Sequence, residues 1–365
     1  MKVKEIINKL DTLAPSMYQE SYDNAGLITG SGNDIVTKVL VSLDCTEEII
    51  EEAIAKGCNL IVAHHPIVFK GLKRLNGKNY VERTIIKAIK NDISIYAIHT
   101  NLDNMQHGVN AKICDLIGLT NQRILAPTQS NLFKLVTYVP SNSIEKVENA
   151  LHLTGAGKIG NYDGCNFRSE GIGSYTPNAN STPTIGDKGI RKSTPEIKLE
   201  IQFQKHLKGQ IINALLSSHP YEEVAYQITA LENTDNEIGS GMYGTLPEAE
   251  DEIEFLKRIK QTFGVGVIRH TPLLNKKIKK VAVCGGSGSF LLRNAMSIKA
   301  DIFITGDFKY HEFFDAEGKI IIADIGHYES EQFTSDLLKD FIESQFETVK
   351  CLKTTINTNP INYFV

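Results

Sequence analysis

The chain has 365 residues with 43 acidic and 39 basic side chains, which gives a formal net charge of -4 without a long run of either sign. This balance excludes the basic surface typical of nucleic-acid-binding proteins, so we do not expect nucleic acid as a ligand. Hydrophobic residues make up 41% of the sequence, which is enough for a packed core, yet no apolar stretch approaches the roughly 20 residues of a membrane-spanning helix.

The amino-terminal segment, residues 1–13, alternates charged and apolar side chains like an amphipathic helix and lacks the uninterrupted apolar region of a signal peptide. We therefore expect a cytoplasmic protein. The six cysteines agree with this location, because they are scattered singly, without a CxxC pair, and are interpreted as reduced core residues.

The first part of the chain predicts a parallel sheet covered by helices. Apolar strands are expected at residues 39–44, 59–63 and 94–98. Amphipathic helices alternate with them at residues 47–56 and 80–91. This alternation is typical of an α/β fold, and it assigns residues 1–127 to the first half of a core domain.

The composition changes near residue 128. Segments with strand and helix patterns follow at 133–140, 143–154, 198–204, 207–217 and 224–231, with a stretch rich in Gly, Asn, Ser and Thr at 158–183. We interpret this as a β-α-β-β-α-β order, which is typical of a ferredoxin-like α+β sandwich. Because the flanks 126–130 and 232–241 resemble linkers, an inserted domain is expected over residues 128–235.

Residues 236–365 return to the first pattern and are predicted to form the second half of the core. Strands are expected at 281–284, 301–305 and 319–323, with a helix at 290–298. Aligning Ala53 with Ala295 places residues 59–65 on residues 301–307, which suggests a duplication. The predicted fold is α/β: a duplicated mixed or parallel-sheet core with helices on its faces, interrupted by the ferredoxin-like α+β insert.

Histidines and carboxylates follow three of the expected strands. They are His64 and His65 after the strand at 59–63, Asp103 after that at 94–98, and His327 and Glu331 after that at 319–323. Side chains beyond the carboxyl ends of such strands gather at one edge of a sheet. A single histidine there is usually a hydrogen-bonded loop residue, but the joint occurrence favours a pair of divalent metal ions held by these five residues.

Other motifs leave alternatives open. Asp307 and His311 stand at the duplicated position and either line the same pocket or serve as a helix cap and a surface residue. The Gly-rich segment 285–288 resembles a phosphate-binding turn but lacks the P-loop lysine, so a tight turn is favoured. Residues 23–27 form either a pocket wall or a turn, and 219–223 are interpreted as local structure in preference to a second metal site.

As an ordered set, these motifs resemble the NIF-three-like dinuclear-metal family, whose members are often named GTP cyclohydrolase I type 2 homologues. The resemblance rests on Asp23-Asn24 with Gly26-Leu27, His64-His65-Pro66, residues 99–103, Thr305-Gly306-Asp307 with His311, and Gly326-His327 with Glu331. Residues 155–162 and 219–224 look like the PII/CutA-like domain that some bacterial members carry. Tyr22 departs from the pattern, since many members have Trp there.

The resemblance implies that the five residues are the metal ligands, with Glu331 as the bridging ligand. Imidazole and carboxylate ligands suit zinc, iron, manganese or cobalt, and we expect two ions per subunit with zinc foremost. It also implies a homohexamer built as a trimer of dimers. The main functional hypothesis is a metal-dependent hydrolase of a small-molecule, nucleotide-like substrate, in which His99 or His311 transfers protons. The alternative is a non-catalytic metal-trafficking or regulatory assembly in which the insert senses a ligand or contacts a partner.

Overall fold

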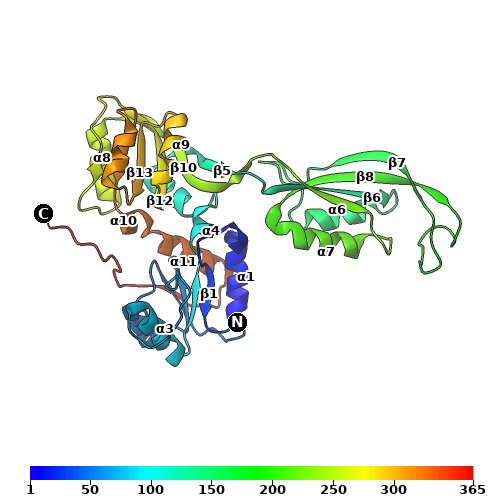
Figure 1. The fold of residues 1–365 in the computed structure, drawn as a ribbon, viewed down its shortest axis with the longest axis horizontal. Helices are drawn as coiled ribbons and strands as arrows, with labels where there is room; N and C mark the ends of the chain where they lie inside the picture. The colour runs from blue at the N-terminus through cyan, green and yellow to red at the C-terminus, as the bar shows by residue number, and fades with distance from the viewer. Residues whose placement is uncertain (365) are drawn as a thin grey trace. The chain divides into compact units, whose positions relative to one another are not determined.

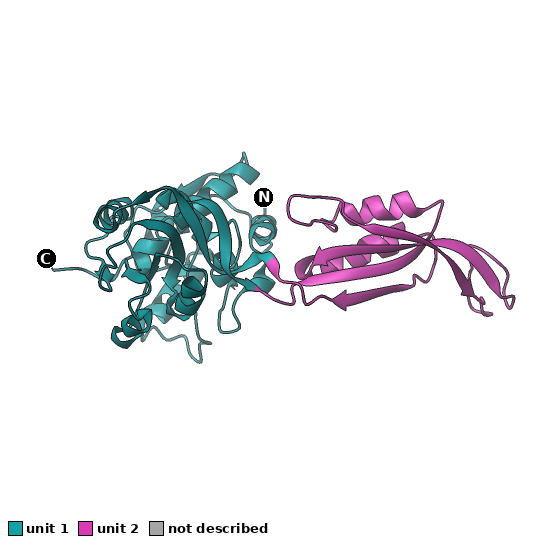
Figure 2. Ribbon diagram, turned by 90° about the horizontal axis from the view of Figure 1, so that it is seen from above, with its two compact units in different colours: residues 1–127, 236–365 teal, residues 128–235 magenta. Residues whose placement is uncertain are grey.

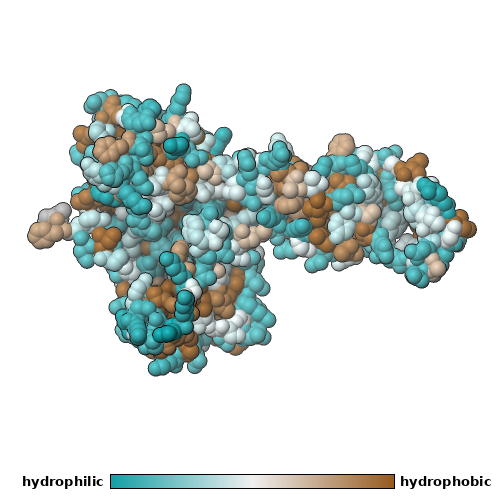
Figure 3. Space-filling view, in the orientation of Figure 1, coloured by the Kyte–Doolittle hydropathy of each residue, from teal (hydrophilic) through white to brown (hydrophobic). Residues whose placement is uncertain are grey.

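A computed structural model describes residues 1–364, and the chain divides into two compact units (Figure 2). Unit 1 comprises Met1–Pro127 and Asn236–Val365, and unit 2 comprises Thr128–Asp235. Within residues 1–364, no helix has both the length and the apolar character needed to cross a membrane. The visible face is largely hydrophilic, with hydrophobic side chains scattered over it (Figure 3).

Unit 1 contains a five-stranded sheet in the order β1-β4-β3-β2-β15. Its edge strand β1 is labelled in Figure 1. Its strands are β1 (Gly26–Thr29), β2 (Val39–Ser42), β3 (Leu60–Ala63), β4 (Ser94–Ala97) and β15 (Cys351–Lys353). All neighbours are parallel except β1, which runs antiparallel to β4. Helices α2 (Glu47–Lys56) and α3 (Tyr80–Lys90) connect the parallel strands and bury apolar side chains against one face. Every residue of β2, β3 and β4 is buried, as expected for a parallel sheet covered on both faces.

A second sheet in unit 1 has the order β11-β14-β13-β12-β10-β5. Its strands are β5 (Thr120–Thr128), β10 (Asp235–Glu250), β11 (Arg269–His270), β12 (Ile278–Ser287), β13 (Ile302–Gly306) and β14 (Ile321–Asp324). The three strands β12, β13 and β14 are parallel, as β2, β3 and β4 are in the first sheet. The helix expected at 290–298 is a 3-10 turn, Ser289–Leu291, followed by the short α9 (Leu292–Ser297). A 3-10 helix, Tyr310–Ala316, joins β13 to β14.

A layer of four helices packs against both sheets and closes the main hydrophobic core of unit 1. These helices are α1 (Val3–Leu13), α5 (Val109–Ile117), α8 (Glu252–Thr262) and α11 (Thr334–Gln345). Their apolar faces meet side chains of β2, β3 and β4 and also of β12, β13 and β14 in one continuous cluster. Because one core joins the two sheets, the carboxyl ends of strands far apart in the sequence are fixed relative to one another. The fold of this unit is thus mixed α/β.

Unit 2 is built around a four-stranded antiparallel sheet in the order β7-β8-β6-β9. Its elements in chain order are β6 (Leu132–Pro140), α6 (Ile144–His152), β7 (Phe167–Tyr175), β8 (Lys192–Gln204), α7 (Lys208–Ser218) and β9 (Tyr226–Ala230). The two helices cover one face of the sheet with a separate apolar cluster. Strand β7 lies in the Gly- and Asn-rich stretch, and most of its residues are exposed.

Candidate metal centre

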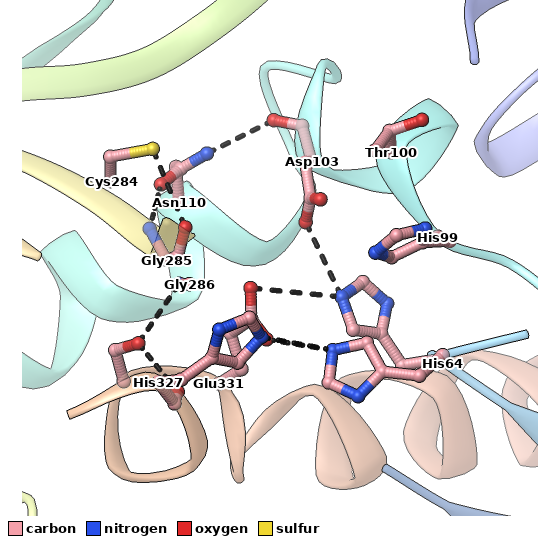
Figure 4. Close-up of polar contacts among 12 residues, drawn as sticks. His64, His99, Thr100, Asp103, Asn110, Cys284, Gly285, Gly286, His327 and Glu331 are labelled. Atoms are coloured by element: carbon pink, nitrogen blue, oxygen red, sulfur yellow. Dashed lines mark hydrogen bonds and ion pairs between the residues drawn. The ribbon is translucent and has the colours of Figure 1, made fainter. Parts of the chain in front are cut away.

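Three strand ends of unit 1 carry the predicted ligands to one place (Figure 4). His64 and His65 directly follow β3, and their backbone N–H groups donate to carbonyls of Ser42 and Leu43 at 3.2 and 2.9 Å. The histidines therefore continue the pairing of β3 with the end of β2 and the residue after it, which fixes where their side chains emerge. Asp103 ends the short helix α4 (Thr100–Asp103) after β4.

The remaining two ligands lie on one helical turn. His327 and Glu331 begin and end α10 (His327–Glu331), which follows β14. Residues four apart share one face of a helix, so both side chains point to the same side. Glu331 is 3% exposed, so its carboxylate is held inside the protein.

The two carboxylate oxygens of Glu331 face two different groups of ligand atoms. Oε2 lies 3.0 Å from Nε2 of His65 and 3.1 Å from Nε2 of His327. Oε1 lies 3.9 Å from Nε2 of His64, which in turn is 3.5 Å from Oδ1 of Asp103. Within each group, His65-His327-Glu331 and His64-Asp103-Glu331, the ligand atoms lie within 4.8 Å of one another. Both groups could hold a metal ion.

Two buried atoms of the second group have no hydrogen-bond partner within the described chain. They are Nε2 of His64 and Oδ1 of Asp103. A buried polar atom without a partner is costly, so such atoms call for an explanation. Nδ1 of His64 lies 2.8 Å from the Ile98 carbonyl, which can only accept, so Nδ1 carries the proton and Nε2 presents a lone pair. The Nε2 lone pair of His64 and Oδ1 of Asp103 face each other in the interior, and a cation would be a suitable partner for both atoms.

Carboxylates behind the histidines orient the other rings in the same way. Nδ1 of His65 donates to Asp44 at 2.7 Å, and Nδ1 of His327 donates to Asp307 at 2.7 Å. Each bond leaves Nε2 facing the centre, which is the usual arrangement of metal-binding histidines. Sequence reasoning missed Asp44 because it placed this residue inside the strand expected at 39–44, whereas β2 ends at Ser42. It assigned Asp307 only to the same pocket or to a helix cap.

The charges of the metal-free centre follow from burial and these bonds. Burial lowers the pKa of His64 to about 3. Burial also lowers the pKa of His65 and His327, but hydrogen bonds to carboxylates outweigh it and raise the values to about 9 and about 11. Burial raises the pKa of Asp103 well above its usual range, while the bonds from His327 and His65 overcome burial and hold the pKa of Glu331 well below it.

Of the two predicted proton-transfer residues, the structure brings only His99 to the centre. Its ring centroid lies 5.3 Å from those of both His64 and His65, and its Nδ1 donates to Asp23 at 2.8 Å. The segment predicted as a wall or a turn therefore supplies the carboxylate that orients His99. His311 is exposed and packs against Tyr310 and Phe314 instead.

The Gly-rich turn after β12 packs directly against Glu331. Gly286 has φ of +60°, and a Cβ there would lie 2.5 Å from Oε1 of Glu331. Its N–H donates to the Ser330 hydroxyl at 3.0 Å, and the N–H of Gly285 donates to Asn110 at 2.9 Å. The glycines permit this close approach, so a tight turn against the ligands describes the motif.

The motif at residues 219–223 of unit 2 forms hydrogen bonds with nearby backbone. The ring of His219 bonds to the Tyr138 carbonyl at 3.0 Å and accepts the Tyr221 N–H at 3.1 Å. Both nitrogens are therefore engaged with backbone. No group of three metal-type ligands occurs in unit 2 within the part of the chain that the structure describes.

The outer carboxylate Asp44 is itself held by the carboxy-terminal segment, because the Thr358 hydroxyl donates to its Oδ2 at 2.5 Å. We expect Asp44→Asn to lower affinity for metal about 10- to 100-fold, since an amide stabilises the His65 ring less well. Titration with a competing chelator measures this. Asp340→Asn, which changes an exposed carboxylate on α11, is the control. Equal affinities of the two variants would contradict the assigned role of Asp44.

Comparisons with known proteins identify relatives of the whole chain. The Duf34/NIF3 (NGG1p interacting factor 3) family profile matches residues 1–360. A Halalkalibacterium halodurans protein named GTP cyclohydrolase 1 type 2 homolog is 36% identical over 98% of both chains, and one of the same name from Bacillus subtilis is 40% identical over 89% of this chain and 88% of its own. The crystal structure of a Bacillus cereus protein related to NIF3 covers 100% of this chain and 99% of its own, with 35% identity and a TM-score of 0.89. The chain therefore belongs to the Duf34/NIF3 family.

Proposed function

We propose that the five residues hold two divalent metal ions and that the protein is a metal-dependent hydrolase of a nucleotide-like substrate. The observation that carries the proposal is the placement of Glu331, whose two oxygens each face a different group of ligand atoms. One oxygen for each ion is how a carboxylate bridges a dinuclear site. The name of the relatives, GTP cyclohydrolase 1 type 2 homolog, supports the substrate class.

The chemistry follows from the ligands and from His99. Two neighbouring ions, when bound, lower the pKa of a water molecule and polarise the bond to be hydrolysed. His99 lines the cavity beside the ligands, and Asp23 fixes its Nδ1–H, so its Nε2 is free to accept or return a proton there. Asp44 and Asp307 hold the imidazole rings of His65 and His327 in place while the proton is transferred.

We propose zinc as the resident metal, because three imidazoles and two carboxylates suit it, with iron, manganese and cobalt as alternatives. Elemental analysis of protein purified without added metal tests both the identity and the number. Two equivalents per chain are expected. One equivalent would overturn the dinuclear proposal while leaving a mononuclear hydrolase possible.

Turnover tests the hydrolase itself. Hydrolysis of a panel of nucleotides and nucleosides is compared for three preparations of the protein: stripped of metal, stripped and then restored with metal, and untreated. We expect hydrolysis only when metal is present and loss of most of it in His99→Ala, which removes the proton carrier but no proposed ligand. Absence of metal-dependent turnover on every compound, with rapid exchange of the bound metal, would favour a metal-trafficking protein instead.

Metal binding is expected to release protons. With pKa values of about 9 and about 11, His65 and His327 are protonated at pH 7 in the metal-free protein, and each must lose its proton to bind metal. Affinity should therefore rise with pH below pH 9, by about tenfold per pH unit for each proton displaced. Calorimetry in buffers of different ionisation enthalpy counts the protons. A heat that is independent of buffer would contradict this prediction.

We also propose that the protein assembles as a homohexamer, a trimer of dimers, and that unit 2 is a ferredoxin-like, PII/CutA-like regulatory insert. The β-α-β-β-α-β order and the strand order β7-β8-β6-β9 support the assignment of unit 2. Light scattering on the purified protein tests the assembly. A monomer at micromolar concentration would overturn it.

A further inference from the structure

The ligand cluster forms one wall of a cavity of about 570 Å³ in unit 1. The other walls are made of two kinds of side chain. The first kind is aromatic: Tyr22, Phe69 and Phe290. The second kind is polar and includes Glu20, Asn104 and Ser240. A cavity of this volume is in the range that encloses a small organic molecule.

The aromatic side chains are unusually exposed. Tyr22, Phe69 and Phe290 are 63%, 45% and 65% exposed, although large apolar rings are normally buried. The ring centroids of Tyr22 and Phe69 lie 6.3 Å apart, and the Phe69 ring meets the His99 ring edge-on at 6.2 Å. Exposed rings that line a cavity offer flat apolar faces for a planar ligand.

The polar part of the cavity wall is made more of side chains with hydrogen-bond acceptors than of cationic side chains. The Asn104 amide donates to Glu20 at 3.1 Å and accepts from the Ser240 hydroxyl at 3.1 Å, so these side chains are held in place. Among residues 1–364, no lysine or arginine lines the cavity. A polyphosphate chain is normally bound by such cations, as well as by metal.

The formal charge of the centre remains negative even with both ions in place. Two divalent ions bring four positive charges, and the histidines are neutral as ligands. Three carboxylates line the cavity, namely Glu20, Asp103 and Glu331, and three more, Asp23, Asp44 and Asp307, bond to the histidine rings behind it. Six negative charges against four positive leave two net negative charges in and behind the cavity wall, which repel a polyanion.

We propose that this cavity takes an uncharged planar heteroaromatic compound of nucleobase or nucleoside size, and that it discriminates against the corresponding triphosphate. The proposal rests on the proposed function and names its substrate class. The aromatic rings bind the flat ring, the acceptors bind its N–H groups, and the surplus of carboxylates excludes a phosphate chain.

Calorimetry with zinc-loaded protein and three probes tests the proposal: guanosine, guanosine monophosphate and guanosine triphosphate. We expect affinity to fall along this series, by at least about tenfold from the nucleoside to the triphosphate. The difference should shrink at about 0.5 M salt, because salt screens the repulsion. The zinc content is measured after each titration, since a triphosphate also chelates zinc.

Variants separate the two parts of the proposal. Phe69→Ala and Phe290→Ala should each weaken guanosine binding about fivefold or more, since each removes a stacking face. Phe314→Ala is the matched control, because Phe314 is 68% exposed but does not line the cavity. Glu20→Lys should strengthen triphosphate binding and leave zinc content unchanged.

The outcomes separate this inference from the proposed function. Triphosphate binding as tight as or tighter than that of guanosine overturns the inference, as does a failure of guanosine to bind or an effect of Phe314→Ala equal to that of Phe69→Ala. None of these results bears on whether metal-dependent hydrolysis occurs. Conversely, guanosine binding without turnover of any compound supports the cavity's specificity and counts against the hydrolase.

Discussion

Replacement of Glu331 by glutamine is expected to remove both metal ions. Each carboxylate oxygen faces its own group of ligand atoms, and the side chain is buried. The amide has one neutral oxygen, and its NH₂ group points a donor at nitrogens or oxygens that should bind a cation. We expect the affinity for metal to fall by more than the about 100-fold that loss of an outer partner costs. Elemental analysis after dialysis against buffer measures this.

A neighbouring glutamate gives the control. Glu329 lies on the same helix and is also buried, but its Oε1 accepts from the Asn359 amide at 3.0 Å instead of facing the histidines. Glu329→Gln should therefore retain two equivalents of metal. If Glu331→Gln also retains two equivalents, with an unchanged circular dichroism spectrum, the bridging role is wrong.

A methyl group at Gly286 is the second change with a large expected effect. Its Cβ would lie 2.5 Å from Oε1 of Glu331, closer than side chains tolerate, and 3.2 Å from Cε1 of His327. The carboxylate must shift, so Gly286→Ala should lose most of the bound metal. The positive φ adds a backbone cost of about 1–2 kcal/mol. Metal content and the temperature of unfolding measure the two effects.

The backbone cost alone can be measured at Gly318. This residue has a similar φ of +65°, but a Cβ there would meet no atom within 4 Å. Gly318→Ala should lower stability by a comparable amount and leave the metal content unchanged. Equal metal loss in both variants would show that backbone strain, and not contact with Glu331, is responsible.

The parallel strands, and the strand ends that carry the site residues, could be predicted from the sequence, because both depend on local periodicity. Strand β3 spans Leu60–Ala63 within the expected range, and His64 follows it as predicted. The mixed α/β character of the core is confirmed. The β-α-β-β-α-β order required a second strand, but the range of β7 was not predicted, because its residues are mostly exposed, so it has no apolar pattern and depends on pairing with β8.

The partners of the site residues depend on tertiary structure and could not be read from spacing. Asp44 and His65 are 21 positions apart, and Asp23 and His99 are 76 apart, yet each pair is hydrogen-bonded. Nothing in the local sequence distinguishes these aspartates from turn or cap residues. His311 illustrates the converse, since it matches a motif in the sequence but lies on a 3-10 helix with its side chain in solvent.

The chain leaves unit 1 at the end of β5 and returns at the start of β10, and these two strands are neighbours in the six-stranded sheet. A short loop could join them in place of more than a hundred residues. Residues 128–235 can therefore be exchanged for a shorter or longer connection without breaking the pairing of β5 with β10, in the way that a hairpin tolerates a change of loop length.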